Sequence, residues 1–342
     1  MEQIKKTGFR KIVFIFGGIA LFLLPLAVVN PYFMYVINLI LIYAILALGL
    51  DLIVGYTGQV SVGHGAFFGI GAYVAAILAK KLGFSLWMNL PLSILVTALI
   101  GFVIGFIGLK LIEEYLVMAT LAFGTIIWLV FLNWNDLTGG PMGIAGIPAP
   151  PPIKIGSFEL LFTRYHDYYP LLLIFVFLGI FVTRLIIKSG FGRACTAIRD
   201  DELAAQAMGI PVFKTKVMMF TISAAFCGAA GALYAHFLRV VSPETFAFGM
   251  SVTILTMVMI GGQGSIAGAL IGASILTVSS ELLRETPELR MLIYGVLIVV
   301  MIMFFPKGVM GLLKMSKKRF FQRNSRIEKK TAIEKEGLSY EQ

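Results

Sequence analysis

Two residues in the N-terminal part of the chain combine a chemically useful side chain with apolar surroundings. Asp51 is the one charged residue between Lys11 and Lys80, and His64 lies in the same stretch. A carboxylate and an imidazole are common partners in acid–base catalysis, so one hypothesis is an intramembrane enzyme that uses this pair. The alternatives are a hydrogen-bonded aspartate near the membrane surface and a histidine that packs in the core.

No other group of residues in the sequence has the spacing of a catalytic or metal site. The histidines His64, His166 and His236 are far apart, and the sequence has neither an HExxH nor a GxSxG motif. It also lacks the GxxxxGK loop, followed by Ser or Thr, that cradles the phosphates of ATP. We therefore predict that the chain has no catalytic residues and no metal or cofactor of its own. If it pumps, the energy must come from another protein.

The composition predicts a membrane protein. Apolar residues make up 58% of the 342 residues, charged residues make up 13%, and the mean hydropathy is +0.91. A soluble domain carries about 25% charged residues. These values argue against a water-soluble enzyme and against a disordered chain.

Apolar windows without charges predict an all-α polytopic protein with about ten transmembrane helices. The predicted spans are 12–30, 33–54, 62–79, 86–109, 115–133, 168–187, 217–238, 246–262, 265–283 and 289–306. Between the fifth and sixth spans lies a polar, proline-rich stretch, 134–167, and between the sixth and seventh a charged loop, 188–216.

The distribution of basic residues predicts the orientation. With ten spans, 21 of the 28 Lys and Arg residues fall on the side of both termini. Cytoplasmic loops carry such an excess, so we place both termini in the cytoplasm and read the basic net charge as topology and not as nucleic-acid binding. The chain then divides into a cytoplasmic N-terminus (1–11), a transmembrane permease domain (12–306) and a basic cytoplasmic tail (307–342).

A Gly-Gln-x-Ser motif occurs twice, each time before a glycine-rich span. The motifs are Gly58–Ser61 and Gly262–Ser265. Transporters often carry broken helices at matching positions of repeated halves. The repeat is either chance or a sign that one of the seventh to ninth spans is re-entrant. The residues that we take as candidates for a substrate path are Gly58, Gln59, Ser61 and His64.

The loop segment 192–211 predicts a short capped helix. Asp200 or Asp201 can cap its start, Gly209 fits the left-handed position after its end, and Pro211 stops it. Leu203, Ala204, Ala207 and Met208 would form its apolar face. A helix this short is marginal in water by itself, so it must pack either against its own bundle or in a groove of a partner.

Four motifs together resemble the membrane permeases of ABC importers, in particular the LivM-type permease subunits of branched-chain amino acid uptake systems. The motifs are Gly55–Tyr73, Leu137–Ile144, Ala197–Gly209 and Pro306–Gly308, and the resemblance covers 30–311. It implies an ABC importer permease bundle in the cell membrane that translocates leucine, isoleucine and valine. The implied partners are two cytoplasmic ATPase subunits that bind the ATP, a LivH-type second permease and an extracytoplasmic substrate-binding protein.

In that family the cytoplasmic helix seats in a groove of the ATPase. The resemblance assigns this coupling role to Arg199, Asp200, Asp201, Glu202, Ala204, Ala205, Met208 and Gly209. We expect Ala205→Arg to abolish transport by disrupting this seat while the protein still folds. A urea or short-amide importer has a very similar permease and remains an alternative. A passive channel is a further alternative, but it would leave the capped helix unexplained.

Overall fold

The structure is a computed structural model that describes residues 30–109, 113–155 and 158–283, with residue 286 and short stretches between 292 and 311. In these parts the chain is a bundle of α-helices with four strands of two or three residues. The predicted segment 1–11, nearly all of the span 12–30, most of 289–306 and the tail 307–342 apart from 308–311 lie outside the described residues.

Five of the described helices are long and apolar enough to cross a membrane, so the prediction of an all-α membrane protein is confirmed. These helices are α2 (Pro31–Thr57), α4 (Leu86–Gly108), α5 (Glu113–Asn133), α7 (Tyr165–Lys188) and α10 (Val212–Leu238). Each overlaps one of the predicted spans because an uninterrupted apolar window forms a helix that satisfies its own backbone inside the lipid.

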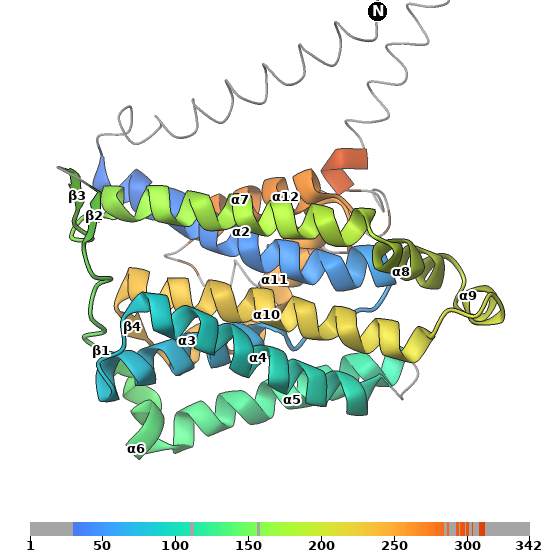
Figure 1. Ribbon diagram of the computed structural model, residues 1–342, viewed down its shortest axis with the longest axis horizontal. Helices are drawn as coiled ribbons and strands as arrows, with labels where there is room; N and C mark the ends of the chain where they lie inside the picture. Colours follow the sequence, from blue (N-terminus) through green and yellow to red (C-terminus); the bar gives the residue numbers. More distant parts are fainter. Residues whose placement is uncertain are drawn as a thin grey trace, which may run out of the picture.

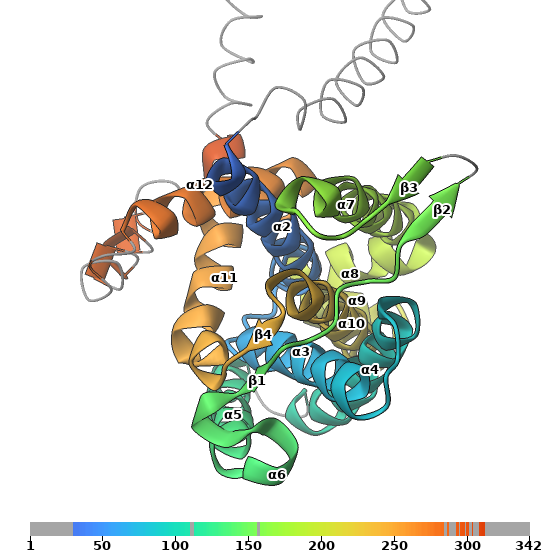
Figure 2. The same cartoon turned by 90° about the vertical axis from the view of Figure 1, so that its left-hand side faces the viewer.

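Three further helices are shorter: α3 (His64–Lys81), α11 (Phe248–Gly261) and α12 (Ile266–Leu282). With 14 residues, α11 is about 21 Å long, less than the ~30 Å hydrocarbon core. The predicted span 246–262 therefore contains a helix that is shorter than the membrane is thick. Figure 2 shows α11 running across the bundle, whereas α2 and α10 are seen nearly end on.

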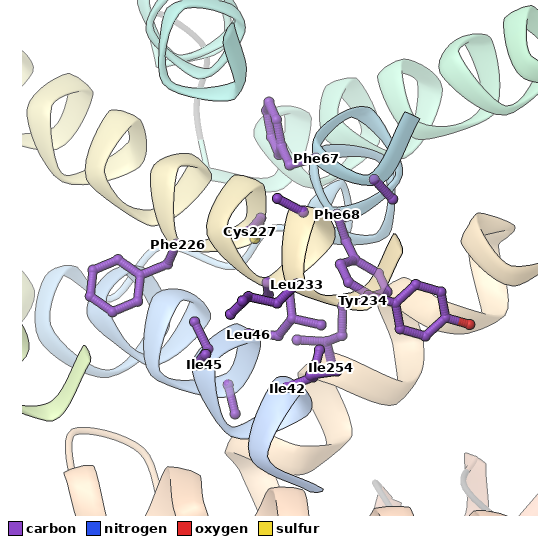
Figure 3. Close-up of a cluster of buried hydrophobic side chains, with 14 of the residues drawn as sticks. Ile42, Ile45, Leu46, Phe67, Phe68, Phe226, Cys227, Leu233, Tyr234 and Ile254 are labelled. Atoms are coloured by element: carbon purple, nitrogen blue, oxygen red, sulfur yellow. The ribbon is translucent and has the colours of Figure 1, made fainter. Parts of the chain in front are cut away.

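Helices α2 and α10 form the centre of the bundle (Figure 2). The most apolar window of α2 is 78% buried and that of α10 is 67% buried, against 17% for the peripheral α5. Side chains of α2, α3, α10 and α11 interlock in one apolar core (Figure 3). Helices α3 and α10 touch through backbone, since a Cβ on Gly71 would lie 2.7 Å from the Cα of Gly228. This close approach is the packing that small residues permit in membranes.

The two ends of the bundle differ (Figure 1). One end, which we call the strand end, carries α6 (Asn135–Thr138), η1 (Gly140–Met142), β1 (Ile144–Ala145), β2 (Ile153–Ile155), β3 (Phe158–Leu160) and β4 (Val240–Val241). The other, the lever end, carries α8 (Gly190–Asp200) and α9 (Glu202–Ala207). A 3-10 turn, η2 (Pro243–Phe246), leads from β4 into α11.

The strand end joins loops that are distant in sequence. Strand β1 pairs antiparallel with β4, with Ile144 opposite Val241, and β2 pairs antiparallel with β3. His236 adds a polar link, because Asn89 Nδ2 lies 3.1 Å from its Nε2 and the carbonyl of Pro148 lies 3.1 Å from its Nδ1. Since a carbonyl only accepts, Nδ1 carries the proton and the ring is a neutral structural connector.

Candidate functional site

The segment predicted as one capped helix forms two helices at the lever end. The Ser189 side chain accepts a hydrogen bond from the Gly192 N–H at 3.2 Å and caps α8. Asp201 Oδ1 accepts one from the Ala204 N–H at 3.0 Å and caps α9. These are the side-chain types that satisfy the free N–H groups of a first turn.

Helix α8 differs from the predicted loop, although its residues carry a helical signal. Phe191, Cys195 and Ile198 recur at helical spacing after the cap Ser189, and Cys195 and Ile198 are buried. The face is only three residues long and the surrounding segment is charged. So short an apolar pattern does not distinguish a helix from a loop.

The end of α9 has the geometry that the sequence predicts. Gly209 adopts φ +82°. Its N–H donates to the Gln206 carbonyl at 3.0 Å, and the Ile210 N–H donates to the Ala205 carbonyl at 3.1 Å. This pair of bonds satisfies two terminal carbonyls and stops the helix.

Helix α9 protrudes with one residue turned inward. Leu203 is 77% exposed and Met208 is 83% exposed, and Ala204 and Ala207 are exposed beside them. Ala205 is 4% exposed, so it packs against its own chain. The expectation that Ala205→Arg would leave folding intact is therefore wrong, because an arginine does not fit that buried position. The apolar face available to a partner is the one around Leu203 and Met208.

Glu202 anchors α9 to the start of α10. Its carboxylate lies 2.5 Å from Lys216 Nζ, and the Lys216 side chain is only 8% exposed while that of Glu202 is 45% exposed. A buried ammonium requires such a partner. The ion pair therefore fixes the angle at which α9 leaves the bundle.

Arg199 joins α8 to the end of α2. Its Nη1 donates to the Gly55 carbonyl at 2.7 Å, and its Nη2 lies 3.0 Å from Asp200 Oδ1. The same side chain covers Gly58, which ends α2 with φ +76°. Arg199 was among the residues predicted to contact an ATPase. In the structure its guanidinium binds the membrane domain of its own chain.

The end of α2 packs against the second Gly-Gln-x-Ser motif at the lever end. Asp51 Oδ1 accepts a hydrogen bond from the Gly264 N–H at 2.7 Å, and the Tyr56 hydroxyl donates to the Gly264 carbonyl at 3.0 Å. Gly55 makes room for this contact, since a Cβ there would lie 2.2 Å from the Gly264 nitrogen. We call this junction of α2, the 262–265 turn and Arg199 the glycine junction.

The role of Asp51 follows from the glycine junction. Its side chain is 1% exposed, one oxygen holds the backbone of the 262–265 turn, and the other has no hydrogen-bond partner in the described part of the chain. A carboxylate that accepts from backbone N–H groups stabilises a helix start. Asp51 therefore supports the break before α12.

A chain of hydrogen bonds joins the break between α2 and α3 to α10 and back to α2. Gly63 N–H donates to Ser61 Oγ at 3.4 Å, Ser61 Oγ lies 3.1 Å from His64 Nδ1, and His64 Nε2 lies 2.8 Å from Ser223 Oγ. Ser223 Oγ donates to the Gly49 carbonyl at 2.6 Å, so its oxygen accepts from Nε2–H. Ser61 then donates to Nδ1, and His64 is neutral with every polar atom satisfied.

The predicted path residues therefore lie together at this break. Gln59 is 1% exposed, with its side-chain oxygen 3.4 Å from the Thr57 hydroxyl. Ser61 and His64 are equally buried, and Gly58 begins the break. His64 and Asp51 are held by different partners, which removes the basis for a catalytic pair. Among the residues that the structure describes, no three His, Cys, Asp or Glu side chains form a metal-binding group.

Comparison with known proteins gives one consistent family. Residues 32–302 match the family model described as the permease component of branched-chain amino acid transport systems. No solved structure matches the chain.

The curated relatives agree with this match. The chain is 38% identical over 288 residues to the high-affinity branched-chain amino acid transport system permease protein LivM of Salmonella typhimurium, covering 79% of this chain and 68% of the relative. It is 37% identical over 311 residues to the LivM protein of Escherichia coli, covering 84% and 73%. A probable LivH permease of Methanocaldococcus jannaschii is 30% identical over 286 residues, covering 78% and 88%.

Proposed function

Because the chain belongs to the permease family of branched-chain amino acid transport systems, we propose how its lever end and its breaks carry out transport. The protein is a multi-pass membrane permease of an ABC importer and not an enzyme. Its transported substrates are the branched-chain amino acids, leucine, isoleucine and valine. The relatives named above are all branched-chain amino acid permeases, and none supports the urea or short-amide alternative.

In our proposal the lever end faces the cytoplasm. Ten spans with both termini inside would place 21 of the 28 basic residues on that side, as the positive-inside rule requires. The division into a cytoplasmic N-terminus (1–11), a permease domain (12–306) and a basic tail (307–342) follows from this topology. The strand end, with the 134–167 connection, then faces outward toward a substrate-binding protein.

The exposed apolar face of α9 carries the proposed coupling role. Leu203 and Met208 are exposed on a charged segment, and burying them in a partner's groove would gain free energy. We assign that groove to a cytoplasmic ATPase subunit, of which the complete importer has two. The residues that border this exposed face are Asp200, Asp201, Glu202, Ala204 and Gly209. Ala205 supports the helix from its buried side.

Two contacts would transmit a movement of α8 and α9 to the membrane domain. The Glu202–Lys216 ion pair ties α9 to α10, and Arg199 ties α8 to the glycine junction. Closure of the ATPase subunits on ATP would carry α8 and α9 as one body and displace the ends of α2 and α12. An ATPase shifts the permease between two states only by binding them with different affinities, so this contact must change between the states.

The break between α2 and α3 is the element that we propose to open toward the substrate. Gln59, Ser61 and neutral His64 offer polar atoms without formal charge, which suits a zwitterion that must bind weakly enough to leave. The path would be completed by a second permease of the LivH type, because relatives of both kinds match this chain.

Leucine uptake by the reconstituted importer tests this proposal. The chain would be assembled in proteoliposomes with its second permease, ATPase subunits and binding protein, and uptake measured with and without ATP. Replacing both Leu203 and Met208 by arginine should abolish ATP-driven uptake and release the ATPase. Met142→Arg is the matched control, because Met142 is 88% exposed at the strand end. Full uptake by the double variant would refute the assignment of α9.

A further inference from the structure

A pocket of about 650 Å³ opens at the strand end, between the start of α7 and the end of α10. Pro31, the first residue of α2, also lines it. Figure 2 views the bundle from this end and shows α7 and α10 beside α2. The volume lies within the range of about 300–1,000 Å³ that small-molecule sites occupy. Neither the break between α2 and α3 nor the face of α9 accounts for this pocket.

Two guanidinium groups from different helices line the pocket. Arg164 is the N-cap residue of α7, and Arg239 follows the last residue of α10. Both are exposed, and neither forms an ion pair in the part of the chain that the structure describes. Their charges therefore remain available to an anion.

The acid at the start of α7 does not neutralise these arginines. Asp167 Oδ2 accepts hydrogen bonds from the N–H groups of Thr163 and Arg164, at 3.2 and 2.8 Å. Asp167 thus stabilises the start of the helix, and it is not among the residues that line the pocket. The pocket is therefore positively charged.

Arg239 has a backbone conformation that suits glycine. Its φ is +59°, and no other non-glycine residue among those described has a positive φ. The residue that ends a helix in this conformation is usually glycine or asparagine, because a larger side chain strains it. Arg239 Nε donates to the Ile147 carbonyl at 3.0 Å, which fixes the guanidinium plane and leaves both Nη groups without a partner in the described chain. Such strain concentrates at ligand sites.

Apolar side chains form the rest of the pocket. Phe162 and Phe237, each 3% exposed, line it together with Pro31 and Leu238. A branched-chain amino acid has a carboxylate that fits the guanidinium groups and a hydrocarbon side chain that fits these walls. An acidic side chain of a partner protein would use the arginines alone.

We propose that this pocket receives the transported amino acid on the outer side of the membrane, with Arg164 and Arg239 as its carboxylate-binding residues. The inference rests on the proposed function, because the strand end faces outward only in the proposed topology. A guanidinium group offers a carboxylate two parallel N–H donors. Since both arginines are exposed, water screens the contact and the amino acid can leave again, as transport requires.

The pocket lies at the outer ends of the two helices that carry the break. Helix α2 begins at the pocket with Pro31 and ends at the break with Thr57. Helix α10 runs from Leu238 in the pocket back to Ser223, which binds His64, over about 22 Å of helix. An amino acid that leaves the pocket would thus reach the break along α2 and α10.

Protection of an introduced cysteine from labelling tests the binding directly. In the assembled importer without its binding protein, Thr163→Cys places a thiol on the exposed lining of the pocket, whereas the native Cys195 and Cys227 are buried. Leucine should slow the reaction of this thiol with a maleimide added outside. Leucinol, which has an alcohol in place of the carboxylate, should not. Equal protection by leucinol would overturn the proposal.

Substitution of the arginines tests their part in the binding. Arg164→Gln and Arg239→Asn should each raise the leucine concentration that gives half protection by roughly fivefold. Asparagine is chosen at position 239 because it tolerates the left-handed conformation. Lys81→Gln is the matched control, since it removes one exposed positive charge at the strand end from a residue that does not line the pocket. Unchanged half protection in either arginine variant, or the same loss in the control, would overturn the proposal.

Titration of the substrate-free binding protein onto the importer separates the two sources of a carboxylate. The arginine variants should bind it as tightly as the unchanged importer does. Weaker binding would assign the arginines to an acidic side chain of the binding protein and contradict the assignment to the amino acid. The labelling requires no transport. Absence of protection together with normal leucine uptake would thus overturn this inference alone, and protection without ATP-driven uptake would overturn only the proposed function.

Discussion

Replacing Arg199 by methionine removes the side chain that links α8 to the end of α2. Its Nη1 lies 2.7 Å from the Gly55 carbonyl, and a hydrogen bond from a charged donor contributes about 1.5–3 kcal/mol. The guanidinium side chain is 38% exposed, so water replaces part of this bond and the loss should lie near the lower value. About 1.4 kcal/mol is a factor of ten in an equilibrium constant. The position in which α8 is packed against the end of α2 would therefore be favoured roughly tenfold less.

The assay compares transport with ATP hydrolysis in proteoliposomes. In Arg199→Met, leucine uptake for each ATP hydrolysed should fall by roughly tenfold while ATP hydrolysis and assembly continue. Methionine retains the apolar contact over Gly58, which limits the loss of stability. Arg193→Met is the control, because Arg193 is also exposed on α8 but donates only to the Lys188 carbonyl at 3.2 Å. A normal ratio in Arg199→Met, or the same defect in the control, would show that the Arg199–Gly55 hydrogen bond does not couple α8 to α2.

Three further substitutions test single contacts. Asp201→Ala should destabilise α9 by about 1 kcal/mol through loss of its cap, seen as faster amide exchange over 202–207, and Asp201→Asn should retain protection. Gly209→Ala should cost about 1–2 kcal/mol because φ is +82°, whereas Gly209→Asn should be better tolerated in the same exchange measurement. Ser223→Ala should lower the melting temperature of the purified protein, since it leaves the buried His64 Nε2–H without its acceptor at about 1–3 kcal/mol. An unchanged melting temperature would contradict the hydrogen-bond chain.

Local signals made much of the fold predictable. The apolar windows located the long helices, and the chemistry of Asp201 and Gly209 defined the limits of α9, because a span or a cap depends on neighbouring residues. The two-residue strands β1 and β4 carry no periodic pattern, and the three-residue apolar face of α8 is short. Neither was predicted for that reason.

The candidate site depended on contacts between distant segments. Arg199 meets Gly55 across 144 positions, and Asp51 meets Gly264 across 213. The repeated motif hinted at related breaks, but nothing in it places the 262–265 turn against the end of α2. Ala205 is likewise buried because of the way α9 packs at the start of α10. The helical period alone does not determine that packing.

Site-specific crosslinking in intact membranes measures whether α9 contacts the ATPase. Background from native thiols should be low, because Cys195 and Cys227 are fully buried and burial raises the pKa of the Cys195 thiol to about 12. A cysteine at Met208 should crosslink to the ATPase subunit in intact membranes, and a cysteine at Met142 should react only with reagents added outside. Crosslinking of the ATPase to the Met142 position, or labelling of the Met208 position from outside, would show that α9 is not the segment that contacts the ATPase.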